Sequence, residues 1–84
     1  MGAKEYIMNR EIELRIGKNI RIARENAKMT QDVLAAKLQL KGCDITRSAI
    51  AKIEVGQRHL YPDEILLIKE ILNIDFDTIF YGNE

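Results

Sequence analysis

The stretch that most constrains the fold is residues 30–56, where two short amphipathic segments lie on either side of a turn. The first segment reads TQDVLAAKL, and the second reads TRSAIAKIE and is followed shortly by a glycine. In each segment the apolar residues recur three and four positions apart, which is the spacing of one face of an α-helix. The pattern therefore predicts two short helices, joined by a turn over residues 40–45, in an all-α domain.

Cap and stop residues divide the whole chain into five helices. Polar residues or proline precede each apolar repeat and predict the helix starts: Asn9, Thr30, Thr46, Pro62 and Asp75. Gly42 and Gly56 are the predicted stops of the second and third helices, because glycine adopts a positive φ without strain. The helices are therefore expected from residue 10 to about residue 27, over 30–40 and 46–54, and from residues 62 and 75.

The apolar positions predict which face of each helix is buried. The first helix carries a stripe that comprises Ile12, Ile16, Ile20, Ala23 and Ala27. Gly17 weakens this stripe and is expected to end one helical segment and start another. The remaining core positions are expected in the turn and in the last four helices: Leu34, Ala35, Leu38, Ile45, Ile50, Ile53, Ile65, Ile68, Leu72, Phe76, Ile79 and Phe80.

Length and charge limit the classes of function. Eighty-four residues make one small domain over 10–84, preceded at 1–9 by a tail or an extra helical turn. The net charge is zero, yet residues 10–60 hold eleven Lys or Arg against six Asp or Glu, whereas residues 61–84 hold one against six. This asymmetry indicates an anionic partner at one end and a solvated or self-associating surface at the other.

Several classes are excluded by what the sequence lacks. No apolar run is long enough to cross a bilayer, and a single cysteine cannot form an internal disulfide, so we expect a cytoplasmic protein. There is no nucleophile–base pair, no pair of carboxylates in an expected pocket and no phosphate-binding glycine loop, which argues against an enzyme. His59 is the only histidine and has no metal-binding cluster beside it, so neither a metal nor a cofactor is expected.

The second helix of the pair has a distinctive start. Small and basic polar residues come first, and Ile50 and Ile53 follow at helical spacing. This is the layout of a helix-turn-helix that reads DNA, in which the start of the second helix enters the major groove.

The same residues resemble a known family, the Xre-like, Cro/repressor-type helix-turn-helix proteins. The resemblance covers about residues 14–81 and is carried by Ile16 to Arg21, Arg24, Thr30, Gln31, Leu34, Ala35, Ile50, Ile53, Glu54, Gly56, Leu72, Ile79 and Phe80. It implies five helices packed as in lambda-repressor-like DNA-binding domains, and sequence-specific binding to operator DNA as a homodimer. The turn is about five residues longer than is usual, which is similar to a long-turn branch of the family, and Lys69 stands where the family often has a small residue.

The resemblance and the side-chain chemistry assign DNA contacts. Arg47, Ser48 and Lys52 match groove-facing positions, where arginine can donate two hydrogen bonds to guanine, and Ala51 is placed to touch a thymine methyl group. Backbone phosphates are expected to be bound by Thr30, Gln31, Gln57, Arg58 and His59. For each of these residues the alternative is an ordinary solvated side chain, or, for Thr30, a helix cap alone.

Two further groups are assigned structural roles. Arg24 and Glu54 match a family pair that joins the first and third helices and fixes geometry more than it adds net stability. Cys43 in the turn is expected to be a half-buried small hydrophobe.

The fourth helix has more apolar residues than one core face needs. Leu67 and Ile71 form a second stripe, and with Phe80 and Tyr81 they are the predicted dimer surface. The alternative is burial of this stripe under the N-terminal tail, through Tyr6, Ile7 and Met8.

Together these patterns predict a transcriptional regulator of the phage- or mobile-element repressor type that binds double-stranded operator DNA. The alternative from another class is a protein-interaction module, such as the antitoxin of a toxin–antitoxin pair, because the C-terminal third is acidic.

Overall fold

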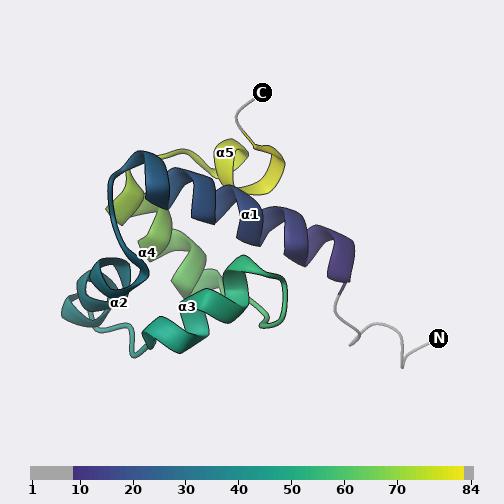
Figure 1. Cartoon of the computed structure of the whole chain (residues 1–84). Coiled ribbons are helices and arrows are strands. Elements are labelled where there is room, and N and C mark those ends of the chain that lie inside the picture. The colour runs from purple at the N-terminus through teal and green to yellow at the C-terminus, as the bar shows by residue number, and fades with distance from the viewer. Residues whose placement is uncertain (1–8, 83–84) are drawn as a thin grey trace.

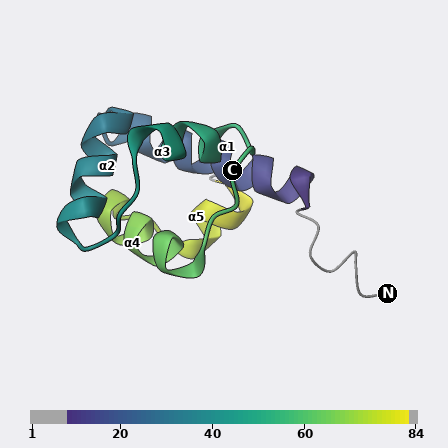
Figure 2. The same ribbon diagram turned by 90° about the horizontal axis from the view of Figure 1, so that it is seen from below.

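Five α-helices make up most of residues 9–82, which are the residues that the computed structural model describes. They are α1 (Arg10–Asn26), α2 (Gln31–Leu40), α3 (Arg47–Glu54), α4 (Pro62–Leu72) and α5 (Phe76–Tyr81). Helix α1 packs against α3 and α5, and α2 packs against α3 and α4. Figure 1 shows α1 crossing the molecule above α3, and Figure 2 shows α2, α3, α4 and α5 arranged around the core. The predicted all-α, five-helix domain with a helix-turn-helix is confirmed.

The helices begin where the cap residues predicted. In four of them a side-chain oxygen of the N-cap accepts a hydrogen bond from the backbone N–H three residues later, at 2.8–3.1 Å; these caps are Asn9, Thr30, Thr46 and Asp75. Pro62 is the first residue of α4, where its missing N–H costs nothing. Each cap satisfies a backbone donor that the first turn of a helix leaves unpaired.

The predicted glycine stops are also confirmed. Gly42 and Gly56 have φ values of +87° and +75°. In each case the next residue donates its N–H back into the preceding helix, from Cys43 to Leu38 O at 2.9 Å and from Gln57 to Lys52 O at 2.8 Å. This backbone arrangement is a Schellman motif, which ends the helix and turns the chain sharply.

The long turn between α2 and α3 is held by its own contacts. Cys43 and Ile45 are both buried in the core, as was expected for Ile45, and Gln39 Nε2 donates to Ile45 O at 2.7 Å. Burial also raises the pKa of the Cys43 thiol above its ordinary value. The extra length of this turn therefore supplies two side chains to the core, and the start of α3 is anchored close to it.

The core agrees with the predicted faces in its centre and departs from them at its ends. Its buried apolar residues are Ile16, Ile20, Ala23, Leu34, Ala35, Leu38, Cys43, Ile45, Ile50, Ile53, Leu60, Ile68, Leu72 and Ile79. Three residues predicted to be buried are instead exposed, namely Ile12 (42%), Phe76 (43%) and Ala27. The first turn of α1 extends past its neighbours (Figure 1), Ala27 is the C-cap after α1, and Phe76 lies under the Lys69 ammonium, 5.3 Å from its ring centre.

The expectation that Gly17 interrupts the first helix is wrong. Helix α1 runs through Gly17 without a break. A Cβ atom at this position would lie 3.1 Å from Glu54 Cα and would meet Ile53 O in α3. Glycine is therefore placed here because the backbones of α1 and α3 approach each other too closely for any side chain.

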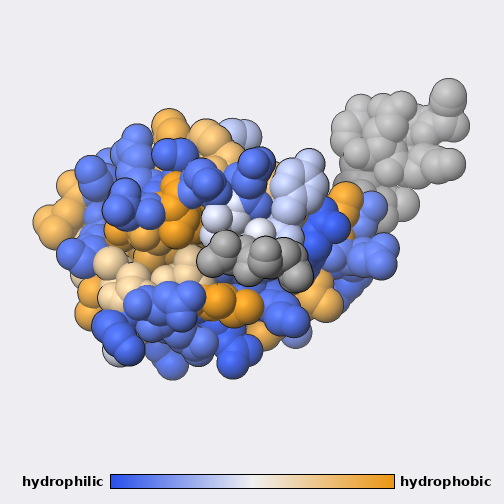
Figure 3. All heavy atoms as spheres, turned by 90° about the horizontal axis from the view of Figure 1, so that it is seen from above, coloured by the Kyte–Doolittle hydropathy of each residue, from blue (hydrophilic) through white to orange (hydrophobic). Residues whose placement is uncertain are grey.

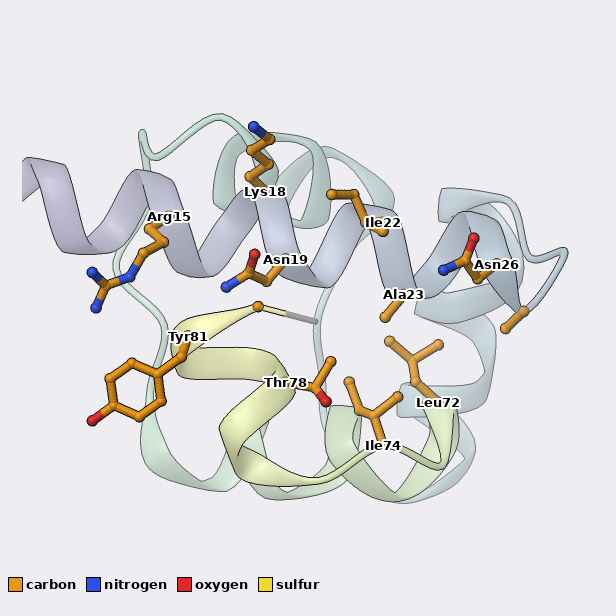
Figure 4. Close-up of a pocket in the computed structure, with 12 residues that line it drawn as sticks. Arg15, Lys18, Asn19, Ile22, Ala23, Asn26, Leu72, Ile74, Thr78 and Tyr81 are labelled. Carbon is orange, nitrogen blue, oxygen red and sulfur yellow. The ribbon is translucent and has the colours of Figure 1, made fainter. Parts of the chain in front are cut away.

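Two side chains of α1 attach the last helix to the body. Arg15 Nε donates to Phe80 O and Asn19 Nδ2 donates to Ile79 O, both at 2.9 Å. Figure 4 shows both side chains reaching from α1 toward α5. They satisfy carbonyl groups that the C-terminus of a helix leaves without partners.

The predicted tail or extra turn at residues 1–9 lies outside the described residues except for Asn9, and so do Tyr6, Ile7 and Met8.

The close contact at Gly17 leads to a stability prediction. Gly17→Ala is expected to destabilise the domain by about 2–3 kcal/mol or more, because the helix crossing must open to admit a methyl group. Intrinsic helix propensity alone predicts the opposite sign, a gain of up to about 1 kcal/mol. Urea denaturation monitored by circular dichroism measures the difference, with Lys18→Ala as the exposed control on the same helix. A stability equal to or above that of the wild type would contradict the close contact.

Candidate nucleic-acid interface

The orientation of α3 is set by its buried face. Ile50 and Ile53 are 1% and 3% exposed and point into the core. The opposite face of the helix then faces outward, and it carries the residues predicted to read bases. Of these, Arg47, Ser48 and Lys52 are exposed, whereas Ala51 is half-buried.

The N-terminus of α2 lies beside this face. Thr30 is exposed, and its Oγ1 is occupied as a cap by the Val33 N–H at 3.1 Å. Gln31 is half-buried and its Nε2 donates to Glu54 Oε1 at 3.0 Å. Gln31 therefore connects the start of α2 to the end of α3, in addition to any contact with DNA.

Arg24 and Glu54 form the centre of a buried polar network. Arg24 donates twice to the Glu54 carboxylate, from Nε at 2.8 Å and from Nη2 at 3.1 Å, and its Nη1 donates to Met29 O at 2.7 Å. Arg24 is 8% exposed and Glu54 5%. The hydrogen bonds to Glu54 raise the pKa of Arg24 further above its ordinary value, so the guanidinium stays charged. With Gln31 on the same carboxylate, the network joins α1, the α1–α2 connection, α2 and α3.

Arg58 and His59 have partners within the protein. Arg58 donates to both carboxylate oxygens of Glu64, at 2.9 and 3.0 Å, and to His59 O at 2.9 Å. The His59 ring lies edge-on to Tyr61, and its Nδ1 is 2.8 Å from Glu13 Oε2 in α1. These contacts fix the connection between α3 and α4, while Gln57 remains exposed.

Glu64 is a buried carboxylate that was not among the predicted site residues. Burial alone would raise its pKa, but hydrogen bonds from Arg58 and from the Tyr61 N–H outweigh burial and hold the pKa below its ordinary value of 4.5. Glu64 therefore stays ionised at neutral pH and locks the loop after α3 onto the start of α4. Its position three residues after the N-cap is the only sequence signal that points to this role.

The predicted dimer surface is partly buried within the domain itself. Leu67, Ile71 and Phe80 are half-buried and pack against the core, whereas Tyr81 is 69% exposed and lies under the Arg15 guanidinium. The more exposed leucine of α4 is Leu66. Leu66 was not among the residues predicted for this surface, because helical spacing alone does not separate neighbouring leucines on a short helix.

A shallow groove of about 520 Å³ lies between α1 and the α4–α5 region (Figure 4). Its apolar lining includes Ile22, Leu72 and Ile74, and its rim includes Arg15 and Lys18. Figure 3, which views the molecule from this side, shows apolar side chains gathered among hydrophilic ones. No feature of the sequence pattern predicted this groove, which is formed where α1 crosses the last two helices.

Neither a membrane-spanning helix nor a metal-binding cluster occurs within residues 9–82. No helix in this range is both long and apolar enough to cross a membrane. Within the same range, no three side chains of His, Cys, Asp or Glu come together in a way that could hold a metal ion.

The fold, with an exposed polar face on its third helix, defines a DNA-binding domain of the helix-turn-helix class. A family model described as helix-turn-helix matches residues 20–79 of the 84. The chain therefore belongs to the helix-turn-helix family, of the Cro/C1, Xre-like type. Members of this family are DNA-binding regulatory domains rather than typical enzymes. No curated protein and no solved structure matches the chain significantly.

The buried network at Glu54 can be tested by removing one partner. Glu54→Ala leaves the Arg24 charge buried without its carboxylate and is expected to cost about 3–5 kcal/mol. The double variant Arg24→Met with Glu54→Leu removes both charges and is expected to recover much of that loss, because the apolar side chains fill the same space. Urea unfolding of the wild type and both variants measures the effect. A Glu54→Ala protein within about 0.5 kcal/mol of the wild type, as for an ordinary surface position, would be inconsistent with this network.

The pKa of Glu64 determines how stability depends on pH. The pKa of Glu64 is lower in the folded state than its ordinary value of 4.5. Glu64 therefore stabilises the fold at pH values above 4.5, and this contribution is lost as the pH falls through the pKa of the folded state. Glu64→Gln is expected to lower stability at neutral pH and to flatten the fall in stability below about pH 5. Thermal unfolding across this pH range provides the measurement, with the exposed Glu70→Gln on the same helix as control. If the stabilities of Glu64→Gln and of the wild type fell in parallel below about pH 5, the lowered pKa of Glu64 would be refuted.

Proposed function

We propose that this protein is a sequence-specific transcriptional regulator of the repressor type, which inserts the start of α3 into the major groove of operator DNA. The observation that carries the proposal is the burial of Ile50 and Ile53, since it turns Arg47, Ser48 and Lys52 outward together. Family membership supports DNA binding in general. A regulator of this kind acts where the genome lies, which agrees with the cytoplasmic location expected from the single cysteine.

Each side chain on the exposed face has a chemical role in the proposal. Arg47 donates two hydrogen bonds to O6 and N7 of a guanine, and Ser48 bonds to an adjacent base edge. Ala51 packs against a thymine methyl group. Lys52, which lies about one and a half turns after Arg47 along α3, contacts a base or a phosphate.

Phosphate contacts position the domain before bases are read. Thr30 and Gln31 stand at the N-terminus of α2, where free backbone N–H groups favour an anion. Gln57 is exposed just beyond α3. Arg58 and His59 are bound to carboxylates, so in this proposal they contribute only those N–H groups that Glu64 and Glu13 leave unused.

We extend the proposal to a homodimer formed through α4 and α5, with Leu67, Ile71, Phe80 and Tyr81 in the contact. The large exposed area of Tyr81 supports this surface, and so do the exposed side chains of Leu66 and Phe76 on the same two helices. A two-fold dimer would place two α3 helices about 34 Å apart, which matches half-sites one helical turn apart on a palindromic operator.

Selection on a randomised duplex library, followed by titration of the selected duplex at several salt concentrations, tests the proposal. Enrichment of a two-fold motif, with affinity that falls steeply as salt increases, is the expected result. Absence of enrichment, or weak binding shared by all duplexes, would overturn the proposed regulator. The alternative of an antitoxin or other protein-interaction module, which family membership does not favour, would then be tested by identifying its protein partner.

Arg47 provides the sharpest single-residue prediction. Arg47→Ala is expected to weaken operator binding by about 1–3 kcal/mol and to abolish the preference at one base pair, since two base-specific hydrogen bonds are lost. Competition binding with the four variants of that base pair measures the preference. Lys69→Ala removes one positive charge on α4, away from the exposed face of α3, and should leave the preference intact. A loss that is equal for all four base pairs would exclude base reading by Arg47.

A further inference from the structure

An acidic residue of α2 faces the proposed base-reading arginine of α3. Asp32 Oδ1 lies 3.9 Å from Arg47 Nε, and the two side chains are 78% and 61% exposed. At this distance the pair is a contact between charges rather than a hydrogen bond. The pair is therefore formed on the outside of the helix-turn-helix, where DNA would dock.

The Asp32 carboxylate offsets an unfavourable electrostatic position of Arg47. Arg47 is the first residue of α3, where the helix dipole is unfavourable to a cation, and the first turn of α3 contains no acidic residue. Asp32 in α2 is the carboxylate within 4 Å that offsets this. A negative charge on a surface that meets phosphates would weaken DNA binding if it had no other effect. The benefit of placing Asp32 beside Arg47 is therefore in the orientation of the guanidinium rather than in the overall attraction of the protein to DNA.

The direction of approach determines what Arg47 still has to offer. Asp32 meets the guanidinium at Nε, so both Nη groups, with their four N–H bonds, remain free at the far end. Two parallel donors spaced in this way match O6 and N7 of guanine. An arginine that is attracted to a carboxylate at Nε samples fewer side-chain conformations before binding, which lowers the entropic cost of the base contact.

We propose that Asp32 is a positioning residue for Arg47, which orients the guanidinium toward guanine and so determines specificity at that base pair. This inference rests on the proposed function and adds a residue outside the expected reading helix. Asp32 acts on the difference between guanine and the other bases, and it lowers affinity for DNA in general.

The test compares Asp32→Ala with a variant of equal charge change. Asp44 is exposed in the turn just before α3, and no described side chain bonds to it, so Asp44→Ala is the matched control. The measurement is competition binding to four duplexes that differ only at the base pair assigned by Arg47→Ala, together with binding to a non-specific duplex. Circular dichroism verifies that each variant is folded.

Asp32→Ala is expected to reduce the guanine preference by about threefold to tenfold, a part of the roughly 5- to 150-fold that a bidentate pair provides, while affinity for the non-specific duplex rises. Asp44→Ala should shift all duplexes equally. In the Arg47→Ala background, Asp32→Ala should cause no further loss of preference. A preference that Asp32→Ala leaves intact, or reduces equally with and without Arg47, would overturn the positioning role alone. A wild-type protein without any base preference would overturn the proposed regulator and this role together.

Discussion

The position of α3 depends on one buried carboxylate, that of Glu54. Glu54 accepts two hydrogen bonds from Arg24 and one from Gln31, so α1, α2 and α3 meet at a single group. All of these hydrogen bonds have to form together, because a buried charge is tolerated only when its hydrogen-bonding capacity is satisfied. Arg24 also holds the connection after α1, since its Nη1 donates to Met29 O in the chain that leads to α2. A polar network of this kind defines one arrangement of three helices, whereas apolar packing alone would admit several.

The same end of α3 is held a second time through its backbone. Gly17 lets α1 approach Ile53 and Glu54 so closely that the two helices have little freedom to slide or rotate. The other end of α3 is anchored by Cys43 and Ile45, which the long turn delivers to the core. With both ends fixed and Ile50 buried between them, the exposed side chains share one rigid platform. Side chains on such a platform need little ordering when they bind, which is the physical basis of specific recognition.

Much of the fold follows from local rules. Thr30, Thr46 and Asp75 bond to the backbone three residues ahead, and Gly42 and Gly56 adopt positive φ, so the helix boundaries could be predicted from short-range chemistry. One error occurred where distant segments meet. Gly17 resembled a helix breaker because its partner, the backbone of α3, is 36 and more residues away in the chain. Phe76 was expected inside and is exposed, because a six-residue helix has room for only a small buried face, which Ile79 occupies.

By itself, the sequence determined the five helices, their caps and the identity of the polar residues at the start of α3. These features depend on neighbours within one or two turns of the chain, where residue type decides conformation. Only the tertiary structure decided which side chains are free to meet a ligand. The packing of the helices pairs Arg58 with Glu64 and His59 with Glu13. It leaves Leu67 half-buried and Leu66 exposed, and it brings Asp32 beside Arg47. The reason is that hydrogen bonds and ion pairs between helices depend on how the helices cross, and a crossing is set by the whole core rather than by any segment.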